Sequence, residues 1–230
     1  MHLKRLYAPK NWPIMRKEYK WIARPLPGPY KIDKCVTLNI ILKDILKYAK
    51  TTKEVKYILN NKEVLVNKVI RKDHKFPVGF MDVLEIPRIN DYYRVLYDKN
   101  GNFILKKINK EDSKIKLCKI IKKFVVKGGK QQITLHDGNN IFAKDDYKVG
   151  DTVVINIENK KIIDWIKLEK DNLIYLVDGK HIGEMGVITN VLNFENVQKP
   201  RVAFKIGNEV FETLKDYVFV IGKKQPVVMV

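Results

Sequence analysis

The stretch TLNIILKDILKYAKTTKEVKYILNNKEVLVNKVI, residues 37–70, decides the fold of the first part of the chain. Its first half places apolar residues at helical spacing with charged residues on the other face, which predicts an amphipathic helix over about 38–49. Thr37 stands at the N-cap position of this helix. Thr51 and Glu54 have the spacing of a capping box, so a second short helix should begin at Thr51 or Thr52 and end near residue 60.

A small hairpin follows the two predicted helices. The segments 64–66 and 69–70 have the composition of short strands and flank the dipeptide Asn67-Lys68. A two-residue turn of type I′ needs positive φ at both positions, which lysine adopts only at a cost of roughly 1 kcal/mol. The sequence therefore favours another type of turn here. Two helices and a hairpin make a compact unit, which the segment 76–86 closes.

The remaining sequence predicts short β-strands. From Tyr92 the apolar pattern has mostly period two, and Asp98-Lys99-Asn100-Gly101 has the composition of a hairpin loop. Similar segments recur up to residue 166 and again over 173–221. Many short strands at this spacing are typical of small sheets or barrels. The fold class expected for the whole chain is therefore α+β with several domains.

The charge of the chain is strongly positive and unevenly distributed. Its 230 residues include 45 Lys and Arg against 26 Asp and Glu, a net charge of +19. The net charge is +7 over residues 1–34, +5 over 35–90, +6 over 91–172 and +1 over 173–230. Such an excess attracts polyanions, and its concentration near the start favours nucleic acid over an anionic membrane or a merely solvated surface. We also expect a soluble protein, because no apolar run approaches a membrane span and the first residues do not resemble a secretory signal.

The first 34 residues predict an extended basic arm. Five prolines interrupt this segment and disfavour helix, while cations alternate with aromatic residues. Cations neutralise phosphates, and aromatic faces stack on unpaired bases. The alternative is that Trp12 and Trp21 pin the arm to the neighbouring domain. The candidate RNA contacts of the arm are Lys4, Arg5, Lys10, Trp12, Arg16, Lys17, Lys20, Trp21 and Arg24.

A second group of candidate contacts lies in the helix–helix–hairpin unit. Basic side chains from two helices and a hairpin can form one patch that follows a phosphate backbone and recognises A-form shape. The alternative for each lysine is an ordinary solvated face. The candidates are Lys43 and Lys47 on the first helix, Lys53 and Lys56 on the second, and Lys68, Arg71 and Lys72 on the hairpin.

The sequence does not predict catalysis, a metal or a cofactor. Cys35 and Cys118 are too few for a disulfide framework or a tetrahedral Cys site, which indicates a reducing compartment. The four histidines lie in different segments, without neighbouring ligands at metal-binding spacing. The glycines of 179–186 precede a predicted strand, whereas a phosphate-binding loop would lead into a helix. An RNA-modifying or tRNA-charging enzyme would need a separate catalytic domain with its own motif.

Several motifs in a fixed order carry a resemblance to a known family. They are HLKR at 2–5, APKNW at 8–12, FPVGFMDV at 76–83, KLCK at 116–119, VDGKHIGEMGVI at 177–188 and FVIGK at 219–223. In this order the chain resembles small-subunit ribosomal protein 4 of the archaeal and eukaryotic type, the S4e family, over essentially its whole length. Because it stops soon after Lys223-Lys224 without a basic tail, it is expected to be of the archaeal type.

The resemblance implies a domain order and a function. It implies a basic arm over 1–34, an alpha-L (S4-type) RNA-binding domain over 35–90, a central β-rich domain over 91–172, and a KOW domain with a small SH3-like barrel over 173–230. The family is a non-catalytic constituent of the small ribosomal subunit in the cytoplasm. Its partners are ribosomal RNA and neighbouring ribosomal proteins, with no membrane, no cofactor and no homo-oligomer of its own. The alternative is a free alpha-L and KOW translation or transcription factor.

Two departures from the family pattern bear on the binding residues. The hairpin turn carries Asn67-Lys68 where the family usually has Asp or Asn followed by Gly, and Val69 takes the place of the usual basic contact. Lys68, Arg71 and Lys72 could replace that contact at a shifted position. In the KOW stretch, Asp178, His181 and Glu184 replace neutral and basic residues. A carboxylate repels phosphate, which favours a protein neighbour or a structural role for this tip.

Overall fold

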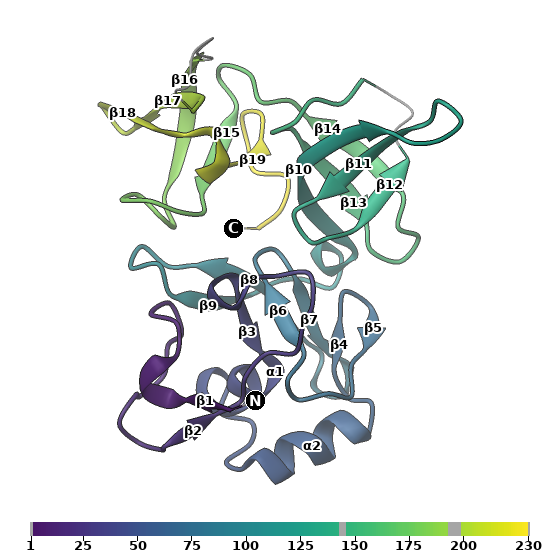
Figure 1. Ribbon diagram of the computed structural model, residues 1–230, viewed down its shortest axis with the longest axis vertical. Coiled ribbons are helices and arrows are strands. Elements are labelled where there is room, and N and C mark those ends of the chain that lie inside the picture. Colours follow the sequence, from purple (N-terminus) through teal and green to yellow (C-terminus); the bar gives the residue numbers. More distant parts are fainter. Residues whose placement is uncertain (1, 143–145, 193–198, 230) are drawn as a thin grey trace. The chain divides into compact units, whose positions relative to one another are not determined.

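The chain folds into two compact units, Met1–Lys114 and Ile115–Val230. The structure is a computed structural model, and it describes residues 2–142, 146–192 and 199–229 (Figure 1). Each unit has its own buried apolar core, and most of its elements are short antiparallel strands. The expected mixture of few helices and many strands is confirmed. In the described ranges no helix is long and apolar enough to cross a membrane.

The first predicted helix is shorter than its apolar pattern indicates. Thr37 caps α1, Leu38–Ile40, by accepting a hydrogen bond from the backbone N–H of Ile40, as expected. The helix then widens into a π-helical turn, Ile41–Ile45. It does not continue through Lys47, which has a φ of 58°. Ala49 is buried, but outside the helix. A left-handed residue cannot continue a right-handed helix, so the turn ends before its apolar pattern does.

The second predicted helix is confirmed in position and capping. It is α2, Thr52–Asn60, and the hydroxyl of Thr51 accepts from the backbone N–H of Glu54. The Glu54 carboxylate in turn accepts from Thr51 and from the backbone N–H of Lys50. These bonds lower the pKa of Glu54. Val55 and Leu59 are fully buried, so this helix presents its lysines to solvent.

Three small sheets complete the first unit. The arm contributes β1, Leu3–Lys4, which pairs with β2, Trp21–Ile22. A second pair joins β3, Cys35–Thr37, to β6, Pro77–Gly79. The largest sheet has the order β5, Val69–Ile70; β4, Leu65–Val66; β7, Val83–Ile86; β8, Asp91–Tyr97; and β9, Phe103–Lys107. Single 3-10 turns lie at Arg5–Tyr7, Ile32–Lys34, Pro87–Ile89 and Asp112–Lys114.

The largest sheet spans the expected boundary at residue 90. β7 and β8 are antiparallel neighbours with Ile86 opposite Asp91, so one sheet continues across that position. The four-part division of the chain is finer than the two units and stays a prediction.

The hairpin turn differs from the expectation. Asn67 and Lys68 have φ values of 51° and 62°, and Val66 pairs with Val69, which makes this a type I′ turn. Local bonds offset the strain at lysine. The Asn67 amide donates to Asp82 and accepts from the backbone N–H of Val83, while the Lys68 ammonium lies 3.0 Å from the Glu85 carboxylate.

The second unit contains two five-stranded antiparallel sheets. The first has the order β12, Asn140–Phe142; β11, Gln131–Leu135; β10, Ile115–Val125; β13, Thr152–Asn156; and β14, Ile162–Ile166. Residue 143, which the sequence also assigned to a strand, lies outside the described residues. Buried side chains from β10, β11 and β13, with Tyr147, form one core around Cys118, Ile133 and Val153.

The other sheet contains the last five strands. Its order is β18, Glu209–Leu214; β17, Arg201–Ile206; β16, Met185–Leu192; β15, Leu173–Leu176; and β19, Val218–Gly222, and a 3-10 turn at Lys215–Tyr217 precedes β19. Phe204 and Phe219 are buried in it. Among the described residues no pairing joins β18 to β19, so the expected closed barrel stays a prediction.

Candidate nucleic-acid interface

The basic arm is folded against the first unit and is not free in solution. Arg5 is 2% exposed, and its guanidinium lies 2.8 Å from Asp44 and 3.3 Å from Glu18. It also donates to the backbone carbonyl of Met15. The sequence included Arg5 among the RNA contacts. Its burial and its two carboxylate partners correct that prediction, because this cation is already neutralised inside the protein.

Trp12 also anchors the arm. It is 2% exposed, and its indole N–H donates to the backbone carbonyl of Cys35 at 2.7 Å. The alternative interpretation, that this tryptophan pins the arm to its neighbour, is therefore confirmed, and we remove Trp12 from the RNA contacts. Arg16 is half-buried and donates to the carbonyls of Ala8 and Pro9, which fixes the arm's bend.

The rest of the arm presents cations and aromatic faces to solvent. Trp21 is 50% exposed, and the Lys20 ammonium lies 5.3 Å from the centre of its ring. Arg24 is half-buried. The exposed lysines of the predicted arm set are Lys4, Lys10, Lys17 and Lys20. The folded arm thus keeps its lysines accessible, while its anchors Arg5 and Trp12 are buried.

The arm and the first helix share one basic surface. The ammonium of Lys43 lies 4.5 Å from the ring centre of Tyr19, which brings the helix cation onto an arm aromatic. Lys47, at the end of the π-helical turn, is exposed. Lys53 and Lys56 project from the exposed face of α2. We define the first-unit basic surface as the predicted lysines that are exposed, together with the half-buried Lys43: Lys4, Lys10, Lys17, Lys20, Lys43, Lys47, Lys53, Lys56 and Lys72.

The hairpin contributes less to this surface than predicted. The ammonium of Lys68 contacts the buried Glu85 at 3.0 Å and lies 3.4 Å from the Ser113 hydroxyl. Its assignment as a replacement RNA contact stays a prediction, because the side chain is partly exposed as well as paired. The Arg71 guanidinium stacks 4.2 Å from the centre of the Phe76 ring. Lys72 is exposed.

The pKa of His74 is lowered, mainly because the ring is partly buried. Partial burial lowers this pKa most, the nearby charge of Lys56 lowers it further, and Lys75 adds to that effect against the opposing charge of Asp73. Positive charges from the helix and from the loop after the hairpin therefore act on the same point in space.

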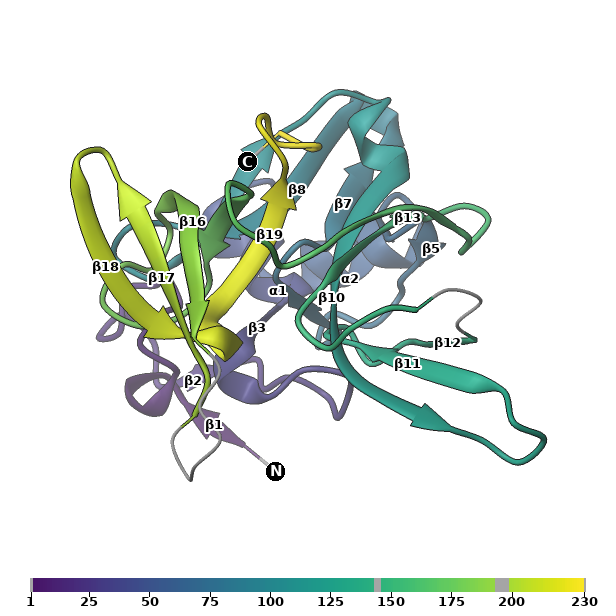
Figure 2. The same ribbon diagram turned by 90° about the horizontal axis from the view of Figure 1, so that it is seen from above.

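The second unit contains a basic ribbon that the sequence analysis did not include among the candidate contacts. Residues 119–130 contain five lysines and no acidic residue, a charge pattern that could have revealed it. Figure 2 shows β10 and β11 extending beyond the other strands of their sheet, to a tip where Gly128 and Gly129 have positive φ. We define the ribbon lysines as Lys122, Lys127 and Lys130, which are exposed.

The other two lysines of this segment are held by the protein. Lys119 donates to three backbone carbonyls between residues 215 and 218, and Lys123 pairs with Asp146 at 2.7 Å. Exposed Phe124 and Val125 lie beside the ribbon lysines. Such a projecting strand pair with cations and apolar side chains can contact RNA.

The groups that could resemble a catalytic site have structural partners. Asp137 pairs with Lys116, and the His136 ring accepts from the backbone N–H of Lys119. Burial, aided by Asp33 and Asp82, raises the pKa of Cys35 to about 12, which keeps this thiol unreactive. In the part of the chain that the structure describes, no group of three acidic, His or Cys residues could hold a metal.

The segment 178–184 uses its charged residues in local contacts. The His181 ring lies 3.0 Å from the Glu184 carboxylate and 4.3 Å from the centre of the Phe211 ring. Asp178 accepts a hydrogen bond from the backbone N–H of Gly179. These contacts stabilise the bend between β15 and β16.

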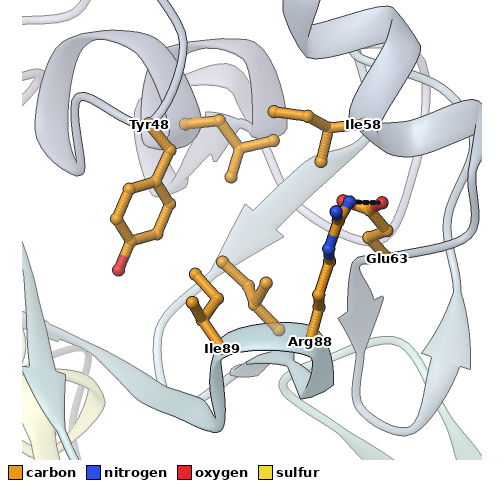
Figure 3. A pocket seen from close by; sticks show the side chains of 7 residues that line it. Tyr48, Ile58, Glu63, Arg88 and Ile89 are labelled. Atoms are coloured by element: carbon orange, nitrogen blue, oxygen red, sulfur yellow. Dashed lines mark hydrogen bonds and ion pairs between the residues drawn. The ribbon is translucent and has the colours of Figure 1, made fainter.

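One pocket of the first unit is mainly apolar. It has a volume of about 340 Å³, and Leu42, Ile58, Ile86 and Ile89 form most of its wall (Figure 3). One side is closed by Arg88, whose guanidinium lies 2.6 Å from Glu63. Aliphatic walls offer little to a phosphate or a base, so we do not include this pocket in the interface.

Comparison with known proteins identifies the family. The family model described as Ribosomal family S4e matches residues 89–162, and the RS4NT (NUC023) domain matches residues 1–33. The small ribosomal subunit protein eS4 of Methanothermobacter thermautotrophicus is 47% identical over 229 residues, which cover 99% of this chain and 94% of that protein. The chain belongs to the S4e family. The eS4 protein of Methanosphaera stadtmanae is 45% identical over 227 residues, which cover 99% of this chain and 94% of that protein.

A solved structure agrees with this S4e assignment. The crystal structure of the 30S ribosomal protein S4e from Thermoplasma acidophilum matches with a TM-score of 0.74 and 36% identity, covering 83% of this chain and 96% of that chain. The RS4NT match coincides with the basic arm, and the S4e match extends across both units. Family membership therefore includes the arm as well as the β-rich body.

Proposed function

We propose that this S4e-family chain is a structural constituent of the small ribosomal subunit, that it binds the RNA of that subunit, and that it is not an enzyme. The observation that carries this proposal is the full-length similarity to eS4 proteins of the small ribosomal subunit, at 47% and 45% identity. Such a constituent acts in the cytoplasm, within the ribosome. Its partners are ribosomal RNA and the proteins beside it.

The first-unit basic surface supplies the proposed phosphate contacts. A lysine that neutralises a phosphate releases a counterion, and this gain needs no base sequence. The surface joins the arm to the two helices, as the approach of Lys43 to Tyr19 indicates. We assign the helices and hairpin to an alpha-L domain over 35–90 and the last five strands to a KOW domain over 173–230. The ribbon lysines form a second contact region.

We propose that the KOW tip contacts a neighbouring protein and not RNA. Its Glu184 is paired with His181, and the last 58 residues carry a net charge of only +1. Little positive charge is therefore available there for phosphate.

Co-sedimentation tests the proposed function. The tagged chain is expressed in cells, or added to extracts, that contain their own ribosomes. Ribosomal and ribosome-free fractions are then separated on a gradient at moderate salt. We expect one copy for each small subunit. Combined substitution of Lys17, Lys20, Lys53 and Lys56 by Gln should shift the chain toward the ribosome-free fractions. Substitution of Lys180, Lys199, Lys205 and Lys224 by Gln removes the same charge from the near-neutral segment and serves as the matched control.

The alternative of a free translation or transcription factor predicts a different distribution. Such a factor would be present in much less than one copy for each subunit, and its amount would vary with growth. Recovery of the wild-type chain only from ribosome-free fractions would contradict the proposed function.

A further inference from the structure

We propose that a pocket between the arm and the first helix holds a single unpaired base of the RNA, an inference that rests on the proposed function. The pocket has a volume of about 200 Å³, and its wall includes Tyr19, Trp21, Asn39, Lys43 and Thr52. Pockets for drug-sized ligands measure about 300–1,000 Å³, so this one suits a smaller, fragment-sized group. A single base is such a group.

Two aromatic side chains in the pocket wall are half exposed, with Arg5 and Lys43 near the Tyr19 ring and His2 and Lys20 near the Trp21 ring. Tyr19 is 53% exposed and Trp21 is 50% exposed, although the arm around them is fixed to the unit. Trp21 lies in β2, paired with β1, and Arg5 holds this region to Asp44 at 2.8 Å. Figure 1 shows the purple arm beside the helices of its own unit. Exposed aromatics on a rigid support are what proteins use to stack unpaired RNA bases.

The charges around the pocket match a nucleotide. The ammonium of Lys43 lies 4.5 Å from the Tyr19 ring centre, and that of Lys20 lies 5.3 Å from the Trp21 ring centre. Each can turn from the ring toward a phosphate beside a stacked base. Arg5 pairs with both nearby carboxylates, Asp44 and Glu18, and together with Lys20 and Lys43 it leaves one net positive charge around the pocket. The net positive charge around the pocket therefore attracts the RNA backbone. An acidic protein segment would gain less from this charge, because the site is narrow.

A polar edge completes the pocket. Asn39 is 6% exposed, and its side-chain carbonyl has no hydrogen-bond partner among the described residues. The hydroxyl of Thr52 lies in the same wall. Buried polar groups are normally paired, and an aliphatic side chain of a neighbouring protein would not supply a donor or acceptor to this amide. The edge of a base carries both, and it would reach this buried oxygen after a small shift of the pocket wall.

A binding experiment with the full chain separates stacking from phosphate binding. The probes are a short fluorescent single-stranded RNA of mixed sequence and the same RNA annealed to its complement. Tyr19→Ala and Trp21→Ala should each weaken binding of the single strand by about tenfold, within the range measured for base stacking. The slope of log affinity against log salt should not change, because every lysine that neutralises a phosphate is still present. Duplex affinity should stay within about twofold.

Matched variants control for folding and for charge. Trp21→Phe should recover most of the single-strand affinity, and Tyr57→Ala, which removes an exposed tyrosine of α2 outside the pocket, should have no effect. Lys43→Ala should instead reduce the salt slope for the single strand by about 0.7. Thermal unfolding of each variant confirms that the unit is folded.

Chemical probing tests the same pocket in the particle. Small subunits that carry Trp21→Ala should show one ribosomal RNA base with increased dimethyl sulfate or carbodiimide reactivity relative to wild type. The proposal is overturned when the aromatic variants bind single strands as wild type does, when they lose duplex affinity equally, or when no base changes reactivity. The last result would assign the pocket to a protein side chain. A wild-type chain that binds no RNA of any kind would refute the proposed function instead.

Discussion

Lys116 and Asp137 form an ion pair that is almost completely buried in the second unit, at 2.8 Å with each side chain 5% exposed. Burial alone would raise the pKa of Asp137. The charges of Lys116 and His136, with hydrogen bonds from Lys116 and Asn139, outweigh burial and hold that pKa far below its usual range. Asp137→Asn leaves the Lys116 charge uncompensated, so we expect the free energy of unfolding to fall by about 3–5 kcal/mol at pH 7, measured in guanidinium.

The same pair predicts an acid dependence with a definite sign. Because the folded pKa of Asp137 lies below its unfolded value of about 3.9, the stabilisation is complete at about pH 5 and above, and it is lost as the pH falls through the unfolded pKa toward the folded one. The difference in the free energy of unfolding between wild type and Asp137→Asn should therefore shrink as the pH is lowered from about 5 to about 2. Asp146→Asn, at the exposed pair with Lys123, should have little effect. A difference that does not change with pH would contradict the assignment.

Lys68 combines a backbone strain with a buried ion pair, and their magnitudes predict which one dominates. Its φ of 62° costs roughly 1 kcal/mol, which glycine would relieve. Lys68→Gly would also leave the buried carboxylate of Glu85 without its cation, at a cost of about 3 kcal/mol or more. We therefore expect a net loss of about 2 kcal/mol in the free energy of unfolding by urea.

The control for this turn is another left-handed lysine. Lys160 has a φ of 53° and is exposed in the turn between β13 and β14. Lys160→Gly should leave stability unchanged or raise it by up to about 1 kcal/mol. If both glycine variants are equally stabilised, the Lys68–Glu85 pair contributes nothing and the argument fails.

At the scale of elements, local signals predict structure correctly where the interacting groups are close in sequence. The capping box at Thr51 and Glu54 predicts the start of α2, because both groups lie within one turn. The first helix ends early because a left-handed residue at Lys47 interrupts a continuous apolar pattern. The pattern reflects burial, and Ala49 is buried without being helical. Periodicity alone cannot separate these two cases.

The ribbon lysines give a prediction for an element that the sequence interpretation missed. Substitution of Lys122, Lys127 and Lys130 by Ala should lower the salt slope for small-subunit RNA by up to about 0.9 for each phosphate that is no longer neutralised. The side chains are exposed, so unfolding should not change. The matched control substitutes three exposed lysines of the same unit, Lys160, Lys161 and Lys170. Equal slopes for the ribbon variant and wild type would exclude the ribbon from the RNA interface.

At the scale of the molecule, the binding candidates divide according to long-range contacts. Arg5 donates to Asp44, which lies 39 residues further along the chain. Trp12 donates to the carbonyl of Cys35, which lies 23 residues further along. Nothing in the local sequence distinguishes these anchors from the exposed Lys4 and Lys10, since all four fit a basic arm with aromatics. Only the folded chain shows that some arm residues are buried and stabilise the unit while others stay exposed. The family motifs, by contrast, depend only on their order along the chain. The sequence alone was therefore sufficient to identify the family.

The buried anchor at Trp12 predicts how the whole chain unfolds. The two units have separate cores, so scanning calorimetry should resolve two transitions. Trp12→Ala removes a fully packed indole and its hydrogen bond to Cys35, at a cost of about 3–5 kcal/mol, and should lower the melting temperature of one transition only. Val153→Ala, in the core of the second unit, should lower the other. A single transition moved by both variants would show that the arm and the β-rich body unfold as one cooperative unit.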